Sequence, residues 1–135
     1  MRKKSTLLIG GAIILLLLLL GLSAVRQHSK QNAPVKISTQ LVTEVLANDS
    51  KSSYALFSDD GKQNVSQDDW TTLVTKLNSF FKGQSPQLSQ KDVSSSIAVV
   101  KYSIKGSDGT YIMTVTLEPV GHTWGVQSFT SALRS

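Results

Sequence analysis

The chain has 135 residues, a formal net charge of +5 and no cysteine. The absence of cysteine excludes disulfide bonds, thiolate metal sites, a cysteine nucleophile and a lipid-modified cysteine. Five of the fourteen Lys and Arg residues precede residue 31, and the rest of the chain carries nine basic and nine acidic side chains. Because that neutral part contains no basic cluster, the sequence predicts no nucleic-acid partner.

An uncharged apolar run extends from Leu7 to Val25, directly after a short basic segment at residues 1–6. As a helix with a rise of about 1.5 Å per residue it would be about 28 Å long, close to the hydrocarbon thickness of a bilayer. Three basic residues precede the run and two follow it, which favours a cytoplasmic N-terminus. The run therefore predicts a single-pass anchor in the cell membrane, with the rest of the chain outside.

A cleaved signal peptide is the alternative for the same run, because a basic start and small residues near Ala24 are typical of such peptides. The run is longer than the usual apolar region of about 7 to 15 residues, and Leu22 stands where cleavage after Ala24 needs a small residue. These features favour the anchor. Cleavage would instead leave a secreted protein that binds a small ligand.

Residues 26–36 are polar, contain Pro34 and predict a linker to one domain at residues 37–135. Apolar residues then recur at spacings of three and four from Ile37 to Leu46, as in an amphipathic helix. A short second helical piece is expected within residues 50–57. Residues 58–62 predict a turn in which Gly61 supplies the permissive backbone.

The strongest helix pattern begins at Ser66, whose hydroxyl is placed to accept a hydrogen bond from the backbone of Asp69 in the manner of a capping box. The apolar stripe of this helix consists of Trp70, Leu73, Val74, Leu77 and Phe80 or Phe81. Gly83 is expected to end the helix.

After Pro86 the apolar period changes from about 3.6 residues to 2. Residues 97–104 and 110–120 alternate apolar and polar side chains around a hairpin turn at residues 107–109. A third strand is expected at residues 124–129, and residues 87–93 predict a fourth, less apolar strand. Helices followed by an antiparallel meander predict an α+β domain, with two or three helices packed on a curved antiparallel sheet of three to four strands.

This order of elements resembles the nuclear transport factor 2-like, cystatin-like superfamily. The resemblance rests on Tyr-Ala-Leu-Phe-Ser at residues 54–58, Ser-Gln-Asp-Asp-Trp at residues 66–70 and Gly-His-Thr-Trp-Gly-Val at residues 121–126. It covers about residues 36–131 and is one of pattern more than of signature residues. It implies a cone-shaped sheet around the long helix, with a cavity that members use for small ligands, dimerisation or catalysis.

Five side chains are candidates to line such a cavity: Trp70, Tyr102, Tyr111, Glu118 and Trp124. The aromatic candidates also fit an ordinary apolar core, whereas Glu118 shares a strand face with Thr114 and Thr116 and is the carboxylate with a possible cavity position. No phosphate loop, nucleophile elbow or metal-ligand spacing occurs, so no catalytic residue, metal or cofactor is predicted.

The sequence therefore favours a non-enzymatic, membrane-anchored domain outside the cytoplasm that binds a protein partner, a second copy of itself or a small apolar ligand. A narrower hypothesis is an envelope assembly component, because proteins of conjugation and type IV secretion machines resemble this plan. The alternative from another class is an enzyme similar to ketosteroid isomerases or dehydratases, with Glu118 as the base and Tyr102 or Tyr111 as hydrogen-bond donor.

Overall fold

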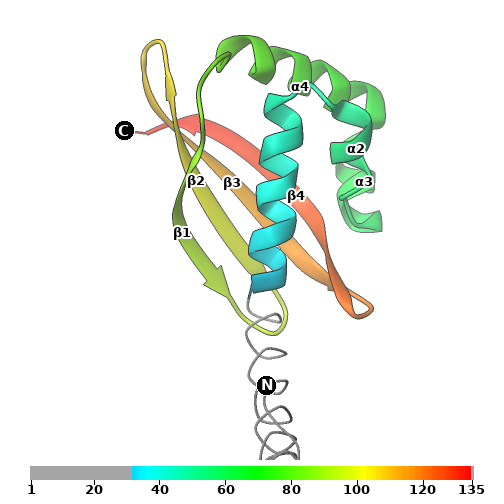
Figure 1. Cartoon of the computed structure of the whole chain (residues 1–135). Helices are drawn as coiled ribbons and strands as arrows, with labels where there is room; N and C mark the ends of the chain where they lie inside the picture. The colour runs from blue at the N-terminus through cyan, green and yellow to red at the C-terminus, as the bar shows by residue number, and fades with distance from the viewer. Residues whose placement is uncertain (1–31, 135) are drawn as a thin grey trace, which may run out of the picture. The chain divides into compact units, whose positions relative to one another are not determined.

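Four antiparallel strands and a set of helices make up residues 32–134, the part of the chain that the computed structural model describes (Figure 1). The predicted α+β class is thereby confirmed. The anchor predicted at residues 7–25 lies outside the described residues. Within residues 32–134 no helix has the length and apolar character needed to cross a membrane.

The first helix covers residues 32–46 of the described chain and is followed by α2 (Ser50–Tyr54), α3 (Asp59–Asn64) and α4 (Gln67–Phe80). The helix includes residues 32–36, which the sequence pattern placed in the linker. Val35 packs against the core, and the hydroxyl of the buried Ser38 bonds back to its carbonyl oxygen at 2.9 Å. These contacts explain why helix extends into a segment that reads as polar.

The sheet has the order β1-β2-β3-β4, with β1 at Gln87–Val93, β2 at Ala98–Gly106, β3 at Gly109–Val120 and β4 at Thr123–Leu133. The hairpin turn predicted at residues 107–109 joins β2 to β3, which pair from Ala98–Leu117 to Gly106–Gly109. The strand predicted at residues 124–129 is longer than expected and extends to Leu133, because its last residues pair with β3.

The cap and the end of α4 agree with those predicted from the sequence. Ser66 caps it by accepting a hydrogen bond from the backbone N–H of Asp69 at 3.1 Å, as the capping pattern predicted. The helix ends at Phe80, and Gly83 follows with a φ of 79°. Of the two phenylalanines at this end, Phe81 enters the core and Phe80 remains 43% exposed.

The turn predicted at residues 58–62 is wrong, because this segment begins α3. Ser58 caps the helix by accepting a hydrogen bond from Gly61 N–H at 3.1 Å. Two aspartates occupy the first turn, where their negative charges interact favourably with the helix dipole. A side chain at Gly61 would overlap the carbonyl oxygen of Val126 and lie 2.8 Å from the Phe57 ring. Glycine is therefore needed for the close approach of α3 to β4, rather than for a turn.

One apolar core lies between the helices and a single face of the sheet. The strands direct alternate side chains into it: Ala98, Val100, Tyr102 and Ile104 from β2, and Met113, Val115 and Leu117 from β3. In Figure 1 the first helix crosses this face, α4 lies across its upper end, and α2 and α3 lie beside β4. The opposite face of the sheet has only half-buried or exposed side chains at the alternate positions.

Candidate functional site

Two of the predicted cavity residues belong to the filled core. Trp70 is 1% exposed, contacts the rings of Phe57 and Phe129, and donates a hydrogen bond from Nε1 to Ser53 Oγ at 2.8 Å. The hydroxyl of Tyr102 lies 2.7 Å from Ser38 Oγ and 2.7 Å from Thr39 Oγ1 in the first helix. Both polar atoms therefore tie helices to the rest of the fold.

Glu118 lies on the other face of the sheet, since it alternates with the buried Leu117. Its carboxylate accepts a hydrogen bond from Ser58 Oγ at 2.6 Å, across the neighbouring strand. Gly125 lies opposite Glu118 on β4, and a Cβ at that position would be 2.9 Å from Ser58 Cβ. The missing side chain at Gly125 thus lets a carboxylate from β3 hold the cap of α3.

The structure does not bring Glu118 together with either candidate tyrosine. Tyr102 and Tyr111 face the helices, whereas Glu118 faces away from them. Along β3, Tyr111 and Glu118 are also seven residues apart, a distance of about 23 Å in an extended strand. The arrangement of base and hydrogen-bond donor that an isomerase-like site needs is therefore not assembled by these three side chains.

The remaining two candidates line separate surface hollows. Trp124 contributes to a hollow of about 390 Å³ with Phe57 and Val120. Tyr111 packs edge-on against Phe80 and Phe81, with ring centroids 5.2 Å apart in both pairs. Its hydroxyl donates a hydrogen bond to Asp108 at 3.1 Å. Burial, followed by this bond and the charge of the carboxylate, raises the pKa of Tyr111 above the ordinary value of 10.0.

A mainly apolar hollow lies between α4 and β4, and we call it the α4–β4 groove. It has a volume of about 590 Å³ and is lined by Leu73, Lys76, Leu77, Phe80, Phe81, Tyr111, Phe129, Thr130 and Ser131. A smaller hollow of about 140 Å³ shares Leu73 and Phe129 with it and continues along β4 to Gln127. Lys76 is the one charged residue in the lining of the groove. The sequence offered a single hint of this site, the adjacent pair Phe80 and Phe81, of which one side chain had to face outward.

The groove runs beside a strand edge that is covered over only part of its length. Val126 N–H donates to Leu56 at 2.9 Å, and Val126 O accepts from Ser58 N–H at 2.9 Å, so the segment before α3 pairs with the first half of β4. A register shift between residues 126 and 128 follows. In the part of the chain that the structure describes, no segment pairs with the outer side of residues 128–133.

The ladder with β3 fixes which backbone groups are left open on this free half of β4, residues 128–133. Arg134 N–H donates to Thr110 O at 2.8 Å, which makes these residues a hydrogen-bonded pair. Bonded pairs recur every second residue in an antiparallel ladder, so Ser128, Thr130 and Ala132 also bond to β3. The N–H and C=O groups of Phe129, Ser131 and Leu133 therefore point away from the sheet.

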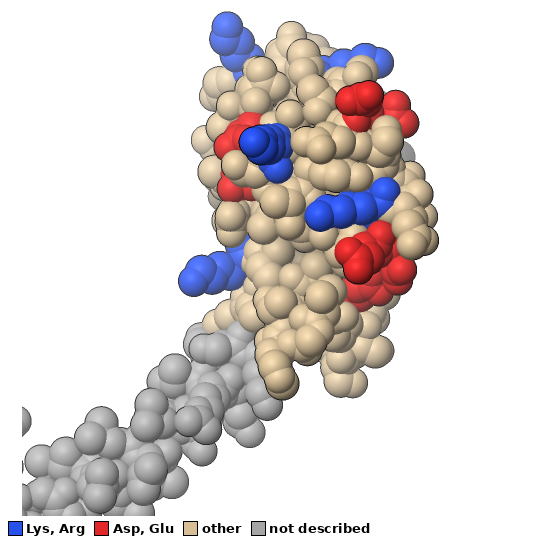
Figure 2. Space-filling view, turned by 90° about the vertical axis from the view of Figure 1, so that its right-hand side faces the viewer, with Lys and Arg blue, Asp and Glu red and all other residues tan. Residues whose placement is uncertain are grey.

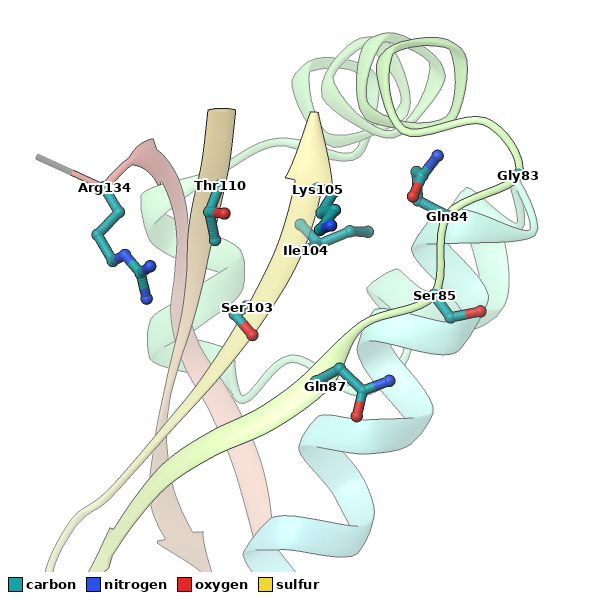
Figure 3. Close-up of a pocket in the computed structure, with 9 residues that line it drawn as sticks. All are labelled: Gly83, Gln84, Ser85, Gln87, Ser103, Ile104, Lys105, Thr110 and Arg134. Carbon is teal, nitrogen blue, oxygen red and sulfur yellow. The ribbon is translucent and has the colours of Figure 1, made fainter. Parts of the chain in front are cut away.

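A second large hollow, of about 510 Å³, lies at the end of the sheet near the β2–β3 turn (Figure 3). One wall is the loop from Gly83 to Gln87, and the other consists of the strand ends. In Figure 3 Thr110 lies between Lys105 and Arg134, in agreement with the register of the three strands. The lining contains these two cations and no acidic side chain, so the wall of this hollow carries only positive charge.

Charge is mixed on the side of the domain that carries α2 and α3. Figure 2 shows acidic groups separated by Lys and Arg side chains on the side of the domain where α2 and α3 lie, without a continuous patch of either sign. Among residues 32–134, no group of three or more His, Asp and Glu side chains is placed to hold a metal ion. Comparisons with protein-family models, curated proteins and solved structures found no match. The resemblance to the nuclear transport factor 2-like superfamily thus stays a prediction.

Proposed function

We propose that this chain is a non-catalytic binding or assembly domain, held outside the cell membrane by a transmembrane anchor at residues 7–25. The observation that carries the binding role is the α4–β4 groove, an apolar hollow of about 590 Å³ beside a strand edge with open backbone groups. Ligand sites are concave and mainly apolar, with a few polar groups that fix orientation. The groove has this character, and the open N–H and C=O groups of β4 are its polar component.

The absence of a catalytic role is supported by how the candidate polar groups are used. Tyr102 bonds to the first helix, Trp70 bonds to α2, and Glu118 bonds to the cap of α3. A catalytic acid or base needs contact with a substrate in a pocket. Each of these groups instead has a partner within the fold, and the space between helices and sheet is filled with apolar side chains.

The anchor and the orientation are supported by the sequence. The run at residues 7–25 has the length of a membrane-spanning helix, and the basic residues at its start favour a cytoplasmic N-terminus. Fractionation of cells that express the full chain tests this part: the chain should remain with the membranes after alkaline extraction. Protease added to spheroplasts should then digest the domain. A chain in the soluble fraction, or a protected domain, contradicts the proposal.

The binding role is tested with a photo-reactive amino acid in place of Lys76 in the full chain, expressed in cells. Lys76 lines the groove, whereas Lys51 on α2 is exposed away from it and provides a matched control. We expect illumination to give one discrete adduct from position 76 and none from position 51. The binding role fails if position 76 gives no adduct, or if both positions give the same mixture.

A further inference from the structure

We infer that the occupant of the α4–β4 groove is a second copy of this chain. Its β4 adds antiparallel to the free half of β4, and the sheet continues through a two-fold axis at Ser131. The inference rests on the proposed binding role of the groove and names the partner. It follows from the chemistry of the free half of β4, from its register and from the side chains beside it.

The free half of β4 lacks the features that normally prevent strand addition. Edge strands are commonly protected by charged side chains, proline or bulges, because open N–H and C=O groups pair readily with another strand. From Thr123 to Leu133, β4 contains no charged residue and no proline. Its bulge lies at residues 126–128, where the covered half ends, so residues 128–133 form an uninterrupted strand.

The register of β4 is self-complementary about Ser131. A two-fold axis at this residue sets Ser131 opposite its own copy and Phe129 opposite Leu133 of the second copy. These are the three residues whose backbone groups point outward, so donors and acceptors of the two strands meet in register. Each such pair exchanges two hydrogen bonds, which gives about six across the interface.

The side chains of the same register also fit. Phe129, Ser131 and Leu133 lie on the helical face, because they alternate with Ser128, Thr130 and Ala132. Leu133 is 50% exposed and Phe80, on the rim of the groove, is 43% exposed. Phe129 of the second copy would lie opposite Leu133 and shield this exposed side chain from water. This apolar contact favours association.

No like charges lie directly opposite each other in the proposed strand pair. On the outer face, Thr130 lies opposite Ala132 of the second copy and Arg134 lies opposite Ser128 of the second copy. Like charges directly opposite each other destabilise a strand pair, and none meet here. A foreign peptide would find one charged residue in the groove, Lys76, and no charge pattern to select it. The neutral strand that matches in both register and polarity is β4 itself.

Strand addition alone gives a smaller interface than most stable dimers have. Copies held in one membrane by the proposed anchor have a high effective concentration, so an interface of this size is sufficient there. The expected state is therefore a two-fold dimer in the membrane that dissociates on dilution. An isologous contact of this kind uses the same patch on both copies and closes at two.

The experiment is cross-linking of the full chain in cells through a single cysteine, which is clean because the chain has no cysteine of its own. Ser131→Cys places the thiols of the two copies next to each other at the proposed axis. Ser89→Cys is the control and places a cysteine on the opposite edge strand, β1. We expect a short bifunctional thiol linker to join Ser131→Cys into a dimer and to leave Ser89→Cys monomeric. Equal yields at the two positions, or no dimer at position 131, overturn the inference that the occupant is a second copy.

A second variant separates the interface from the fold. Ser131→Pro removes an N–H that points outward and is not used within the sheet, so the domain should keep its structure. We expect the detergent-solubilised full chain to dimerise about tenfold or more weakly, since both copies lose a bond at the axis. Ser89→Pro, at the bulge of β1, should dimerise like the original chain. Unchanged dimerisation of a folded Ser131→Pro chain contradicts the inference.

The two proposals fail in different ways. An adduct of twice the chain mass from the photo-reactive group at position 76 supports the second copy. An adduct with another protein, without a cross-link at position 131, overturns the second copy and leaves the binding role intact. The absence of any adduct at position 76 contradicts both the binding role and the second copy as occupant.

Discussion

The two edges of this sheet are protected in different ways. β1 carries Lys91 and Asp92, follows Pro86, contains a bulge between residues 88 and 90, and is exposed along nearly its whole length. β4 has none of these side chains and is covered over its first half by the segment at residues 56–58. The residues of β1 itself therefore protect that edge against strand addition. The first half of β4 is instead protected by a segment that is distant in sequence. The part of β4 that receives neither is the part beside the apolar groove.

Disruption of the packing of α3, and of the preceding segment at residues 56–58, against β4 should have the largest effect on stability. In Gly61→Val the new side chain meets Val126 O and the Phe57 ring, so we expect the free energy of unfolding to fall by about 3 kcal/mol. Gly121→Asn is the matched control: this glycine has a φ of 61° and open space around it, and the change should cost less than about 1 kcal/mol. Chemical denaturation measures both, and equal losses would contradict the role of α3 as a tightly packed cover.

Proline at consecutive positions of the free half of β4 tests which backbone groups are open. Thr130→Pro removes an N–H that bonds to β3 and leaves a carbonyl without its partner, so we expect a loss of about 2 kcal/mol. Ser131→Pro removes an outward N–H and should cost less than about 1 kcal/mol. Denaturation curves at high dilution, where the dimer is dissociated, give the comparison. The reverse order of stability would show that the N–H of Ser131, and not that of Thr130, bonds to β3.

Removal of the charges from β1 should make the two edges alike. In Lys91→Val with Asp92→Val, β1 becomes an uncharged edge, so we expect association beyond the dimer in sedimentation or light scattering. Asp60→Val with Lys62→Val makes the same change of composition at two exposed positions of α3, outside either edge strand. If both double variants associate to the same extent, general hydrophobicity rather than edge pairing is responsible.

The smallest effect concerns Tyr111, at the end of the groove. Burial, then the hydrogen bond and charge of Asp108, raises the pKa of Tyr111 above 10.0. A phenol with a raised pKa in the folded state contributes stability that is fully present below the unfolded pKa and is lost as pH rises through the folded pKa. We therefore expect a small loss of stability in alkali beyond pH 10.0. In Asp108→Asn the ultraviolet titration of Tyr111, obtained by difference against Tyr111→Phe, should move to lower pH.

Local rules were sufficient for much of the fold. The cap at Ser66, the hairpin turn before Gly109 and the alternation along β2 and β3 each depend on residues close in sequence, and the structure confirms all three. The sequence predicts a turn in place of α3 because Asp-Asp-Gly-Lys has the composition of a turn. What makes it a helix is its docking on Val126, a contact that no local pattern contains.

The candidate site was less accessible from sequence. Residue type makes Trp70 and Tyr102 candidates for a cavity, but burial and hydrogen bonding give them places in the core. The end of β4 reads as polar, and pairing with β3 makes it a strand. Which edge of a sheet stays open depends on the order of strands and on the path of distant segments. The groove beside Phe80 therefore became visible only in three dimensions.

The contact between Ser58 and Val126 joins residues 68 positions apart in the chain. Contacts of such long range form late in folding, because the entropy of closing the loop must be overcome first. The β3–β4 hairpin is local and is expected to be complete earlier, with its entire outer side open. We therefore expect a newly made chain to aggregate most readily before α3 docks, and a change that delays docking to prolong that period.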